Sequence, residues 1–363
     1  MNLRRLACKL DDSTVKQLTL KDYGWGAHFQ AQLTDDDAAF LAVRVLAVHR
    51  DALDVAGPGY EGRVLPFAPS DDDEVQATVG DWLLFDVESR RPARRLERRS
   101  VFKRKNAGSG RRVQLIASNV DTLLLVTSAN QDFNVARLER YLALAAEAEV
   151  APVVVITKAD LSKDVEPFLT AARRLMRGLV VEAFDAREPL SLKCLEPWFG
   201  RGQTLALLGS SGVGKSTIVN SMRGEALLHT QGIREDDARG RHTTTGRSLH
   251  RLECGAWLMD TPGMRELQIV DAAEGLAEVF SDVAELAAAC RFSDCGHEGE
   301  PGCAVQAALD AGTLDAGRVK RFGKLQREER RNSESVAVAH ERNRKFGRMA
   351  KRVFAHKLRN REW

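Results

Sequence analysis

Two different hydrophobic patterns divide the chain. Between residues 20 and 90 the apolar runs are short, and turn-forming residues such as Gly57-Pro58-Gly59 and Asp71-Asp72-Asp73 interrupt them. Short runs separated by turns are typical of β-strands in a small β domain. A five-stranded barrel fits the size of this segment, although the spacing alone does not distinguish it from other small β folds.

From Val120 onward, apolar runs alternate with amphipathic segments. The runs predict strands at Leu123–Val126, Val153–Ile156, Leu179–Val181, Leu205–Leu208 and Ala256–Met259. The helical periodicity predicts helices over about residues 134–149 and 164–177. Strands that alternate with helices indicate a parallel α/β sheet, so we expect one α/β unit from residue 120 to about residue 272. The alanine-rich segment 272–289 and the basic C-terminal tail are predicted to be helical.

Charge is distributed unevenly over the 363 residues, whose net charge is +3. Residues 318–363 hold sixteen Lys and Arg against five Glu, whereas the rest of the chain holds 38 Lys and Arg against 46 Asp and Glu. A second basic stretch, Arg90 to Arg112, has eleven Lys and Arg against one Glu. These basic segments indicate a polyanion partner, RNA above all, with solvated charged helices as the alternative.

No secretion or membrane signal is recognisable. No run of about 18 apolar residues occurs, and six of the first twenty residues are charged. We therefore expect a cytoplasmic protein with no membrane partner, and we expect it to be monomeric.

A glycine-rich loop follows the strand predicted at Leu205–Leu208. The sequence G-S-S-G-V-G-K-S-T satisfies G-x-x-x-x-G-K-[ST] between a strand and an apparent helix. Glycines let backbone N–H groups wrap phosphates, Lys215 neutralises the β- and γ-phosphates, and the Ser216 hydroxyl suits Mg²⁺. The nucleotide-binding residues predicted here are Gly209, Ser210, Ser211, Gly212, Val213, Gly214, Lys215, Ser216 and Thr217.

The tetrapeptide T-K-A-D follows the strand predicted at Val153–Ile156, at the ligand-binding edge of such a sheet. Asp160 there can accept hydrogen bonds from guanine N1–H and N2–H₂, a donor pair that adenine lacks. Taken alone, the tetrapeptide also fits a strand-to-helix turn capped by Asp160. The residues predicted to bind the base of GTP are Thr157, Lys158, Ala159 and Asp160.

The motif D-T-P-G closes the run Ala256–Met259. Its Asp260 suits a magnesium-bound water, and the Gly263 amide suits the γ-phosphate. The polar stretch Arg239 to Gly246 contains a histidine and three threonines, one of which is expected to close over the metal. The predicted catalytic residues are Lys215, His242, Asp260 and Gly263. The candidate magnesium ligands are Ser216, Thr243, Thr244, Thr245 and Asp260. A Pro-Gly turn and a solvated threonine loop are the alternatives.

Met264 occupies the position where many GTPases carry a water-orienting glutamine. A methionine cannot orient water, so we expect slow hydrolysis by the isolated protein and acceleration by its partner. His242 is the candidate for placing the water. Two rival interpretations stay open at this point: an RNA-binding scaffold that holds GTP without turnover, and an ATPase in which T-K-A-D is coincidental.

Three cysteines and one histidine gather as C-x₄-C-x-H-x₅-C. Cys290, Cys295, His297 and Cys303 offer three thiolates and an imidazole, a soft tetrahedral set that suits Zn²⁺. With all four positions filled by protein, a zinc ion here would be structural. Buried free thiols beside a surface histidine are the alternative.

The order of the motifs is rotated, because T-K-A-D ends 49 residues before Gly209 (209 minus 160), whereas ordinary GTPases place it last. With this order the chain resembles the circularly permuted ribosome small-subunit-dependent GTPase A family over nearly all its length. The residues that carry the resemblance, besides the motifs above, are Gly80-Asp81-Trp82, Ala117-Ser118-Asn119-Val120-Asp121, Arg137 to Leu142, and Gly240-Arg241-His242-Thr243-Thr244-Thr245.

The resemblance implies a multidomain protein with a function in late maturation of the small ribosomal subunit. It implies an N-terminal extension at 1–19, an OB-fold β-barrel at 20–115, an α/β P-loop GTPase domain at 116–272 and a mostly helical zinc-binding domain with a basic tail at 273–363. It also implies GTP hydrolysis with Mg²⁺, stimulated by the subunit, contact with the subunit's rRNA, and one zinc ion per chain. Thr157 departs from the family's usual Asn, so we expect an amide that braces the base and the phosphate loop to be lost, with weaker affinity.

Overall fold

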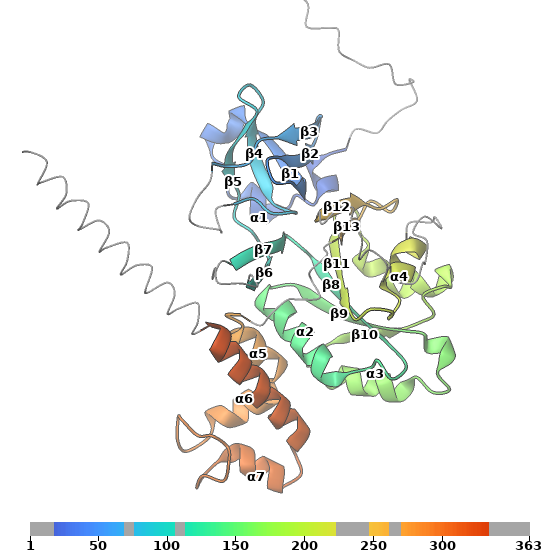
Figure 1. Cartoon of the computed structure of the whole chain (residues 1–363), viewed down its shortest axis with the longest axis vertical. Helices are drawn as coiled ribbons and strands as arrows, with labels where there is room; N and C mark the ends of the chain where they lie inside the picture. The colour runs from blue at the N-terminus through green and yellow to red at the C-terminus, as the bar shows by residue number, and fades with distance from the viewer. Residues whose placement is uncertain (1–17, 69–75, 106–112, 223–246, 261–269, 334–363) are drawn as a thin grey trace, which may run out of the picture.

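The molecule has a β-rich part, an α/β part and a small helical part, and a single sheet runs through the first two. The computed structural model describes residues 18–68, 76–105, 113–222, 247–260 and 270–333. Within these residues, eleven strands share one sheet, in which β-rich and α/β parts follow one another, while a small helical part lies at the far end (Figure 1). In the part of the chain that the structure describes, no helix is both long and apolar enough to cross a membrane.

The first part of the sheet is antiparallel and includes the turn-rich segment. Its strands are β1 (Leu41–Val48), β2 (Leu53–Gly57), β3 (Tyr60–Val64), β4 (Trp82–Asp86) and β5 (Arg91–Arg95), in the order β3-β2-β1-β4-β5. The first four residues of β4 are apolar because both faces of the strand are buried there: Leu83 and Phe85 join one hydrophobic cluster, and Trp82 and Leu84 join another.

Short helices cover one face of this sheet. They are η1 (Leu20–Tyr23), α1 (Ala27–Gln30) and η2 (Asp35–Ala39). The ring of Trp25, between η1 and α1, packs edge-on against Trp82 with 4.8 Å between ring centroids. A separate hairpin of β6 (Val101–Lys105) and β7 (Val113–Ser118) then leads into the α/β part.

The second part of the sheet confirms the predicted parallel α/β unit. Strands β10 (Val180–Ala183), β9 (Ala151–Thr157), β8 (Thr122–Ser128), β11 (Thr204–Gly209) and β13 (Trp257–Asp260) run parallel in that order. The predicted helix over residues 134–149 is α2 (Val135–Glu147), which begins where the Asn134 side chain accepts a hydrogen bond from the Arg137 amide. The second predicted helix is shorter than expected, as α3 (Glu166–Arg173).

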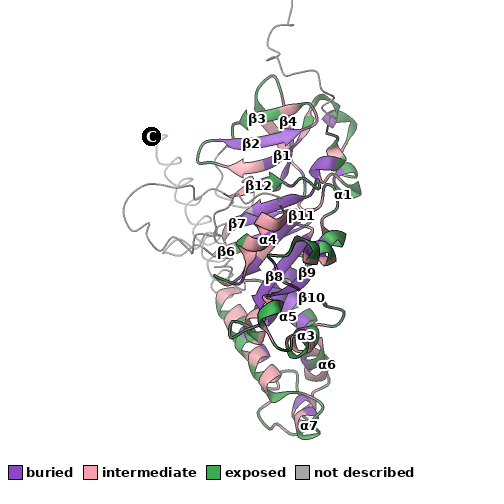
Figure 2. Ribbon diagram, turned by 90° about the vertical axis from the view of Figure 1, so that its right-hand side faces the viewer, coloured by how far each residue is buried: buried purple, intermediate pink, exposed green. Residues whose placement is uncertain are grey.

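Strand β12 (Ser248–Arg251) joins the two parts of the sheet. It pairs with β13 on one side and, at Ser248, with Ala47 of β1 on the other. Figure 2 shows the resulting continuous sheet, with its buried residues concentrated along the central strands. The hydrophobic pattern did not predict β12, because of its four residues only Leu249 is buried.

A buried arginine fastens the β-rich part to the α/β part. Arg44 of β1 is 1% exposed and donates hydrogen bonds to Tyr23 O at 2.6 Å and to Thr204 Oγ1 of β11 at 2.8 Å. Its Nη2 also donates to Asn119 O at 3.2 Å. Burial lowers the pKa of Arg44 to about 10, so the side chain stays charged at neutral pH.

Replacing Arg44 with leucine should therefore destabilise the whole sheet. The acceptors at Tyr23, Asn119 and Thr204 would stay buried without a donor, at an expected cost of about 2–4 kcal/mol in the free energy of unfolding. Urea denaturation followed by tryptophan fluorescence measures this cost, with Arg173→Leu on the exposed face of α3 as the control. An Arg44→Leu midpoint equal to that of the wild type would contradict the bridging role of this arginine.

The C-terminal part is helical and packs against α2. The predicted helical segment 272–289 forms two helices, α5 (Ala273–Val279) and α6 (Ser281–Ala288), which are separated at the buried Phe280. Beyond α7 (Ala304–Asp310), residues 316–333 form a further helix. Gly275 of α5 lies so close to α2 that an added Cβ would be 2.5 Å from Ala143 O.

Two arginines of the basic tail anchor this helical part to the α/β part. The Glu139 carboxylate of α2 is fully buried and accepts hydrogen bonds from Arg318 at 3.1 Å and from Arg321 at 2.6 Å. Their charge is therefore used within the molecule and is not offered to a polyanion. The remainder of the tail, residues 334–363, lies outside the described residues.

Candidate functional site

The carboxyl ends of the parallel strands bring the predicted motifs to one edge of the sheet. Strand β9 ends at Thr157, β11 ends at Gly209 and β13 ends at Asp260. Strands β9 and β11 flank β8, and β13 lies on the other side of β11. This edge is the usual ligand-binding side of an open parallel sheet, so segments that are far apart in sequence meet at one site.

The glycine-rich loop takes a shape that only glycine permits. At Gly209 an added Cβ would lie 2.2 Å from Val126 O of the neighbouring strand. Gly212 and Gly214 have positive φ values of 76° and 95°. The loop leads into α4 (Lys215–Met222). At the start of any helix the first backbone N–H groups have no partner within the helix. Such a loop at a helix N-terminus forms an anion-binding cradle.

Two cationic side chains converge on this loop. The Lys215 ammonium donates to Gly209 O at 2.8 Å and also to Ser210 O. Arg137 of α2 donates to the Ser210 hydroxyl. Backbone carbonyls and a hydroxyl are weaker partners for a cation than a phosphate is, so both side chains are positioned to favour an anion at the loop.

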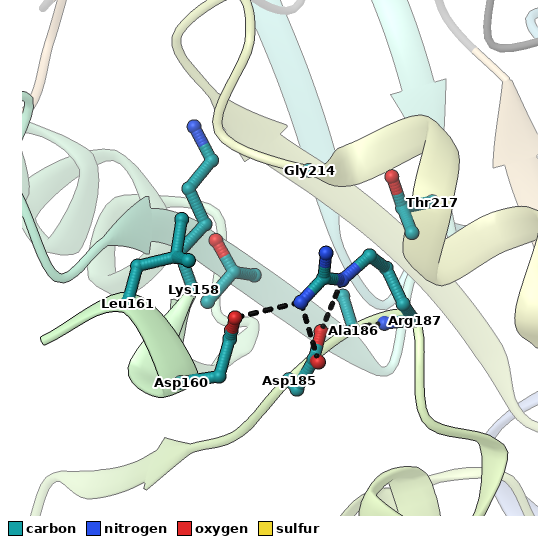
Figure 3. A pocket seen from close by; sticks show the side chains of 9 residues that line it. Lys158, Asp160, Leu161, Asp185, Ala186, Arg187, Gly214 and Thr217 are labelled. Atoms are coloured by element: carbon teal, nitrogen blue, oxygen red, sulfur yellow. Dashed lines mark hydrogen bonds and ion pairs between the residues drawn. The ribbon is translucent and has the colours of Figure 1, made fainter.

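A pocket lies between the loop and the T-K-A-D segment (Figure 3). Its wall includes residues from β9 and the turn after it, from the segment after β10, and from α4. The lining residues are Thr157, Lys158, Asp160, Leu161, Asp185, Ala186, Arg187, Gly214 and Thr217. Lys158 has a left-handed backbone with φ 57°, and its side chain in Figure 3 extends along the pocket toward the loop.

The Thr157 hydroxyl braces the glycine-rich loop. Its Oγ1 lies 2.5 Å from Val213 O in the loop and 3.0 Å from Thr127 O in β8. The amide that the sequence led us to expect to be lost is absent, but the shorter Thr157 hydroxyl reaches the carbonyl oxygen of Val213 and so makes a contact with the loop in its place. The expected weaker affinity for the nucleotide stays a prediction.

An ion-pair network occupies one wall of the pocket. Arg187 Nη2 lies 2.6 Å from Asp160 Oδ2 and 2.9 Å from Asp185 Oδ2. Arg187 Nε also donates to Asp185 Oδ1 at 3.0 Å. The hydrogen bonds from Arg187 hold the pKa of Asp185 below its usual range, and Asp185 in turn raises the pKa of Arg187.

The sequence analysis missed Asp185, Arg187 and the contact of Arg137 with the loop. Asp185 follows β10, whose parallel strand ends at the same edge of the sheet as β9. A search for polar residues just beyond each predicted strand, Leu179–Val181 included, would have found Asp185 and Arg187.

Several predicted site residues lie outside the described residues. These are His242, Thr243, Thr244, Thr245 and Gly263, together with Met264. Asp260 is described as the last residue of β13, beside β11 in the sheet. The predicted phosphate-loop and base-site residues, by contrast, are described, and members of both groups line one pocket.

A second site lies in the helical part, where the four predicted metal ligands come together. The ligand atoms of Cys290, Cys295, His297 and Cys303 all lie within 4.8 Å of one another. His297 Nδ1 is 3.6 Å from Cys290 Sγ and 3.5 Å from Cys303 Sγ, and the two sulfurs are 3.9 Å apart.

The three distances that join Cys290, His297 and Cys303 fit the edges of a tetrahedral metal site. With Zn–S of about 2.3 Å and Zn–N of about 2.0 Å, the tetrahedral edges are about 3.8 Å between sulfurs and about 3.5 Å between sulfur and nitrogen. The sulfurs of Cys290 and Cys303 are too far apart for a disulfide, whose S–S bond is about 2.05 Å. The cluster can therefore hold a metal ion.

Part of the basic stretch Arg90 to Arg112 is neutralised by neighbouring carboxylates. Arg94 pairs with Asp37 at 2.5 Å, Arg98 pairs with the buried Asp81 at 2.8 Å, and Arg99 pairs with Asp121. Arg90, in the turn before β5, and Arg91, the first residue of β5, are exposed. The stretch offers a polyanion less charge than its sequence indicates.

Comparison with known proteins gives consistent likenesses. A family model described as RsgA GTPase matches residues 95–270. The Vibrio vulnificus protein named small ribosomal subunit biogenesis GTPase RsgA 2 is 47% identical over 340 residues, 93% of this chain and 96% of that protein. The Mesorhizobium japonicum protein named small ribosomal subunit biogenesis GTPase RsgA is 49% identical over 329 residues, 88% of this chain and 92% of that protein.

Two solved structures share the fold. YjeQ from Thermotoga maritima has a TM-score of 0.58 at 23% identity and covers 78% of this chain and 96% of its own. YloQ, described as a circularly permuted GTPase, has a TM-score of 0.57 at 24% identity and covers 82% of this chain and 97% of its own. The rotated motif order inferred from the sequence thus has a counterpart in a solved fold.

Proposed function

This chain belongs to the RsgA GTPase family, and on that basis we propose that it hydrolyses GTP to GDP and phosphate while it assists late maturation of the small ribosomal subunit. It is a GTP hydrolase of the P-loop type, as its family is. The curated relatives are named for small ribosomal subunit biogenesis. Binding to the subunit and its rRNA, and stimulation of hydrolysis by the subunit, are parts of the proposal.

The observation that carries the proposal is the shared wall of the pocket. Asp160 and Gly214 line the same pocket, and the Thr157 hydroxyl joins the two segments at Val213. A base held by Asp160 would therefore place its phosphates along the loop that leads to Lys215. A T-K-A-D tetrapeptide that was coincidental would have no reason to adjoin a phosphate loop.

Each motif then has one role in the proposed site. The loop Gly209–Thr217 wraps the phosphates, and Lys215 neutralises the β- and γ-phosphates. Asp160 accepts from the guanine edge, and Lys158 lies along the base. Family membership implies Mg²⁺ with GTP, and this ion would neutralise charge on the β- and γ-phosphates. Ser216, Asp260 and one of Thr243 to Thr245 would hold it.

The remaining catalytic groups stay proposals based on sequence. We assign the γ-phosphate contact to Gly263 and the placing of the water to His242. Met264 cannot orient water, so the groups of this chain contribute positioning and charge. We propose that the bound subunit provides the further acceleration of hydrolysis.

For the second site we propose a structural zinc ion held by Cys290, Cys295, His297 and Cys303. The proposal is supported by the tetrahedral edges and by the soft donor set. The Cys303 sulfur also accepts a hydrogen bond from the Gln306 amide at 3.3 Å, which orients it at the start of α7.

The N-terminal part is proposed to be the OB-fold that contacts the subunit. Strand β1 pairs with β2 and β4, and these two pair with β3 and β5, as in a partly open five-stranded barrel. The domains are proposed to extend over 20–115, 116–272 and 273–363, after the extension 1–19.

The sheet supplies a route between GTP and the proposed OB-fold. Strand β12 pairs with β13 of the GTPase part and with β1 of the proposed OB-fold, and the Arg247 guanidinium donates to Leu115 O of β7 at 2.6 Å. We propose that affinity for the subunit depends on the bound nucleotide, with β12 as the connection between the two parts.

The substitution Asp160→Asn tests the base assignment. We expect GTP affinity to fall at least about 100-fold, because an amide cannot accept both guanine hydrogen bonds. Xanthosine triphosphate, which carries an oxygen in place of the guanine amine, should bind the variant better than it binds the wild type. Titration with ribose-labelled nucleotides measures both effects, with Asp51→Asn in the turn after β1 as the matched control. Unchanged GTP affinity in Asp160→Asn, or equal affinity of the wild type for ATP and GTP, would contradict the assignment.

A further inference from the structure

The carboxylate proposed to recognise guanine already has a partner within the chain. Arg187 Nη2 lies 2.6 Å from Asp160 Oδ2, and Figure 3 shows the guanidinium lying between Asp160 and Asp185 inside the pocket. The Asp160 side chain is 28% exposed and that of Arg187 is 67% exposed. The arginine therefore covers the carboxylate from the solvent side and can move away into water.

The guanidinium resembles the edge of guanine that Asp160 would bind. In guanine, N1–H and the C2 amine are two N–H donors on one planar carbon. In Arg187, Nη2 is likewise a donor on a planar carbon that bears two further nitrogens. A carboxylate pairs with either group through the same charge-assisted or dipolar hydrogen bonds. Arg187 thus offers Asp160 an N–H donor of the same kind as those of guanine.

Asp185 keeps this arginine in place. Nε and Nη2 of Arg187 donate to the two oxygens of Asp185 at 3.0 and 2.9 Å, and the Arg187 amide donates to Oδ1 at 3.0 Å. These three hydrogen bonds do not involve Asp160. Arg187 can therefore release Asp160 to a base while it remains bound to Asp185, and it can pair with Asp160 again when the base leaves.

We propose that Arg187 is a built-in competitor of guanine for Asp160, which stabilises the nucleotide-free site and promotes the release of GDP. This inference rests on the proposed role of Asp160 as the guanine acceptor. The contact is with Asp160, which would bind the base that GDP and GTP share, so Arg187 weakens the binding of GDP and of GTP by the same factor. It sets how tightly the site holds guanine nucleotides, and it does not sense the γ-phosphate.

Removal of Arg187 tests the competition. In Arg187→Ala, we expect the Kd values of ribose-labelled GDP and GTP to fall by the same factor, about twofold to fivefold, which is the range for a partly exposed ion pair. GDP release should slow in stopped-flow displacement. The ratio of wild-type to variant Kd should approach one as the salt concentration rises, because salt screens the pair. Arg173→Ala, which removes an exposed arginine of α3 paired with Glu166, is the matched control.

A double substitution separates competition from a general change of the pocket. In the Asp160→Asn background Arg187 has no charged partner at position 160, so adding Arg187→Ala should leave the affinity for xanthosine diphosphate unchanged. If Arg187 had only a structural role, Arg187→Ala would change the nucleotide affinity by the same factor in the wild-type and in the Asp160→Asn background.

The outcomes distinguish this inference from the function on which it rests. If Asp160→Asn loses GDP but Arg187→Ala binds GDP as the wild type does, or more weakly, the competitor role is wrong and the guanine assignment stands. If Asp160→Asn keeps its affinity for GDP, the assignment itself fails, and the competitor role fails with it. Tighter binding that is equal for GDP and GTP, and absent in the Asp160→Asn background, supports the proposal.

Discussion

Replacement of Lys215 by alanine is expected to lower GTP hydrolysis by about a hundredfold to a thousandfold while the fold stays intact. The Lys215 ammonium donates to Gly209 O at 2.8 Å and also to Ser210 O, both in the same loop. These contacts hold the ammonium at the loop where the β- and γ-phosphates are proposed to bind, and preorganised charge of this kind contributes most to phosphoryl transfer.

Phosphate release measures the effect of Lys215→Ala, with nucleotide binding followed in parallel by fluorescence of ribose-labelled GTP. Lys193→Ala is the control, because Lys193 is an exposed lysine in η4 (Pro189–Trp198), outside the loop. Circular dichroism and the thermal midpoint should match those of the wild type. Turnover by Lys215→Ala at the wild-type rate would mean that the loop Gly209–Thr217 does not hold the reacting phosphates.

Loss of the proposed zinc ion is expected to unfold the segment around α7 while it spares the sheet. In Cys303→Ser, a buried sulfur that lies 3.5 Å from His297 Nδ1 is replaced by a hydroxyl, a poor zinc ligand. Because the binding energy of a structural zinc ion is also folding energy, the residues between Cys290 and Cys303 should lose their protection.

The ion pairs that hold the helical part on α2 should limit this unfolding to the segment around the cluster. Arg318 and Arg321 hold the helix over residues 316–333 on Glu139, independently of the cluster. Hydrogen exchange should therefore rise over residues 290–310 in Cys303→Ser or after chelation, and α2 should stay protected. Elemental analysis should find one zinc per wild-type chain. Cys254→Ser, at an exposed cysteine, is the control. A wild-type protein that carries no metal and is indifferent to chelators would rule out the zinc site.

The buried strands and the glycine-rich loop were predictable because their signals are local. The runs at Leu123–Val126, Val153–Ile156 and Leu205–Leu208 lie inside β8, β9 and β11, since strands covered on both faces are apolar throughout. The loop spacing was equally local. The break at Phe280 between α5 and α6 was not visible, because the alanine- and leucine-rich sequence on both sides continues the same helical pattern.

The features that escaped prediction depend on residues far apart in the sequence. Strand β12 is held by β1, about 200 residues earlier, and its polar sequence carries no alternation. From the sequence, Arg318 is predicted to belong to a polyanion-binding tail, and only the structure shows that it pairs with Glu139. Likewise, only the folded chain places Arg187 on Asp160, because an ion pair between two loops leaves no periodicity.

The central claim is that this P-loop enzyme is a GTP-specific switch that the small ribosomal subunit stimulates. The most direct test is phosphate release by the purified full-length protein with GTP or ATP, each in the presence and absence of small ribosomal subunits. We expect slow hydrolysis of GTP alone, a sharp rise in the rate when subunits are added, and no comparable activity with ATP. A preference for ATP, or a GTP hydrolysis rate that subunits leave unchanged, would contradict the account.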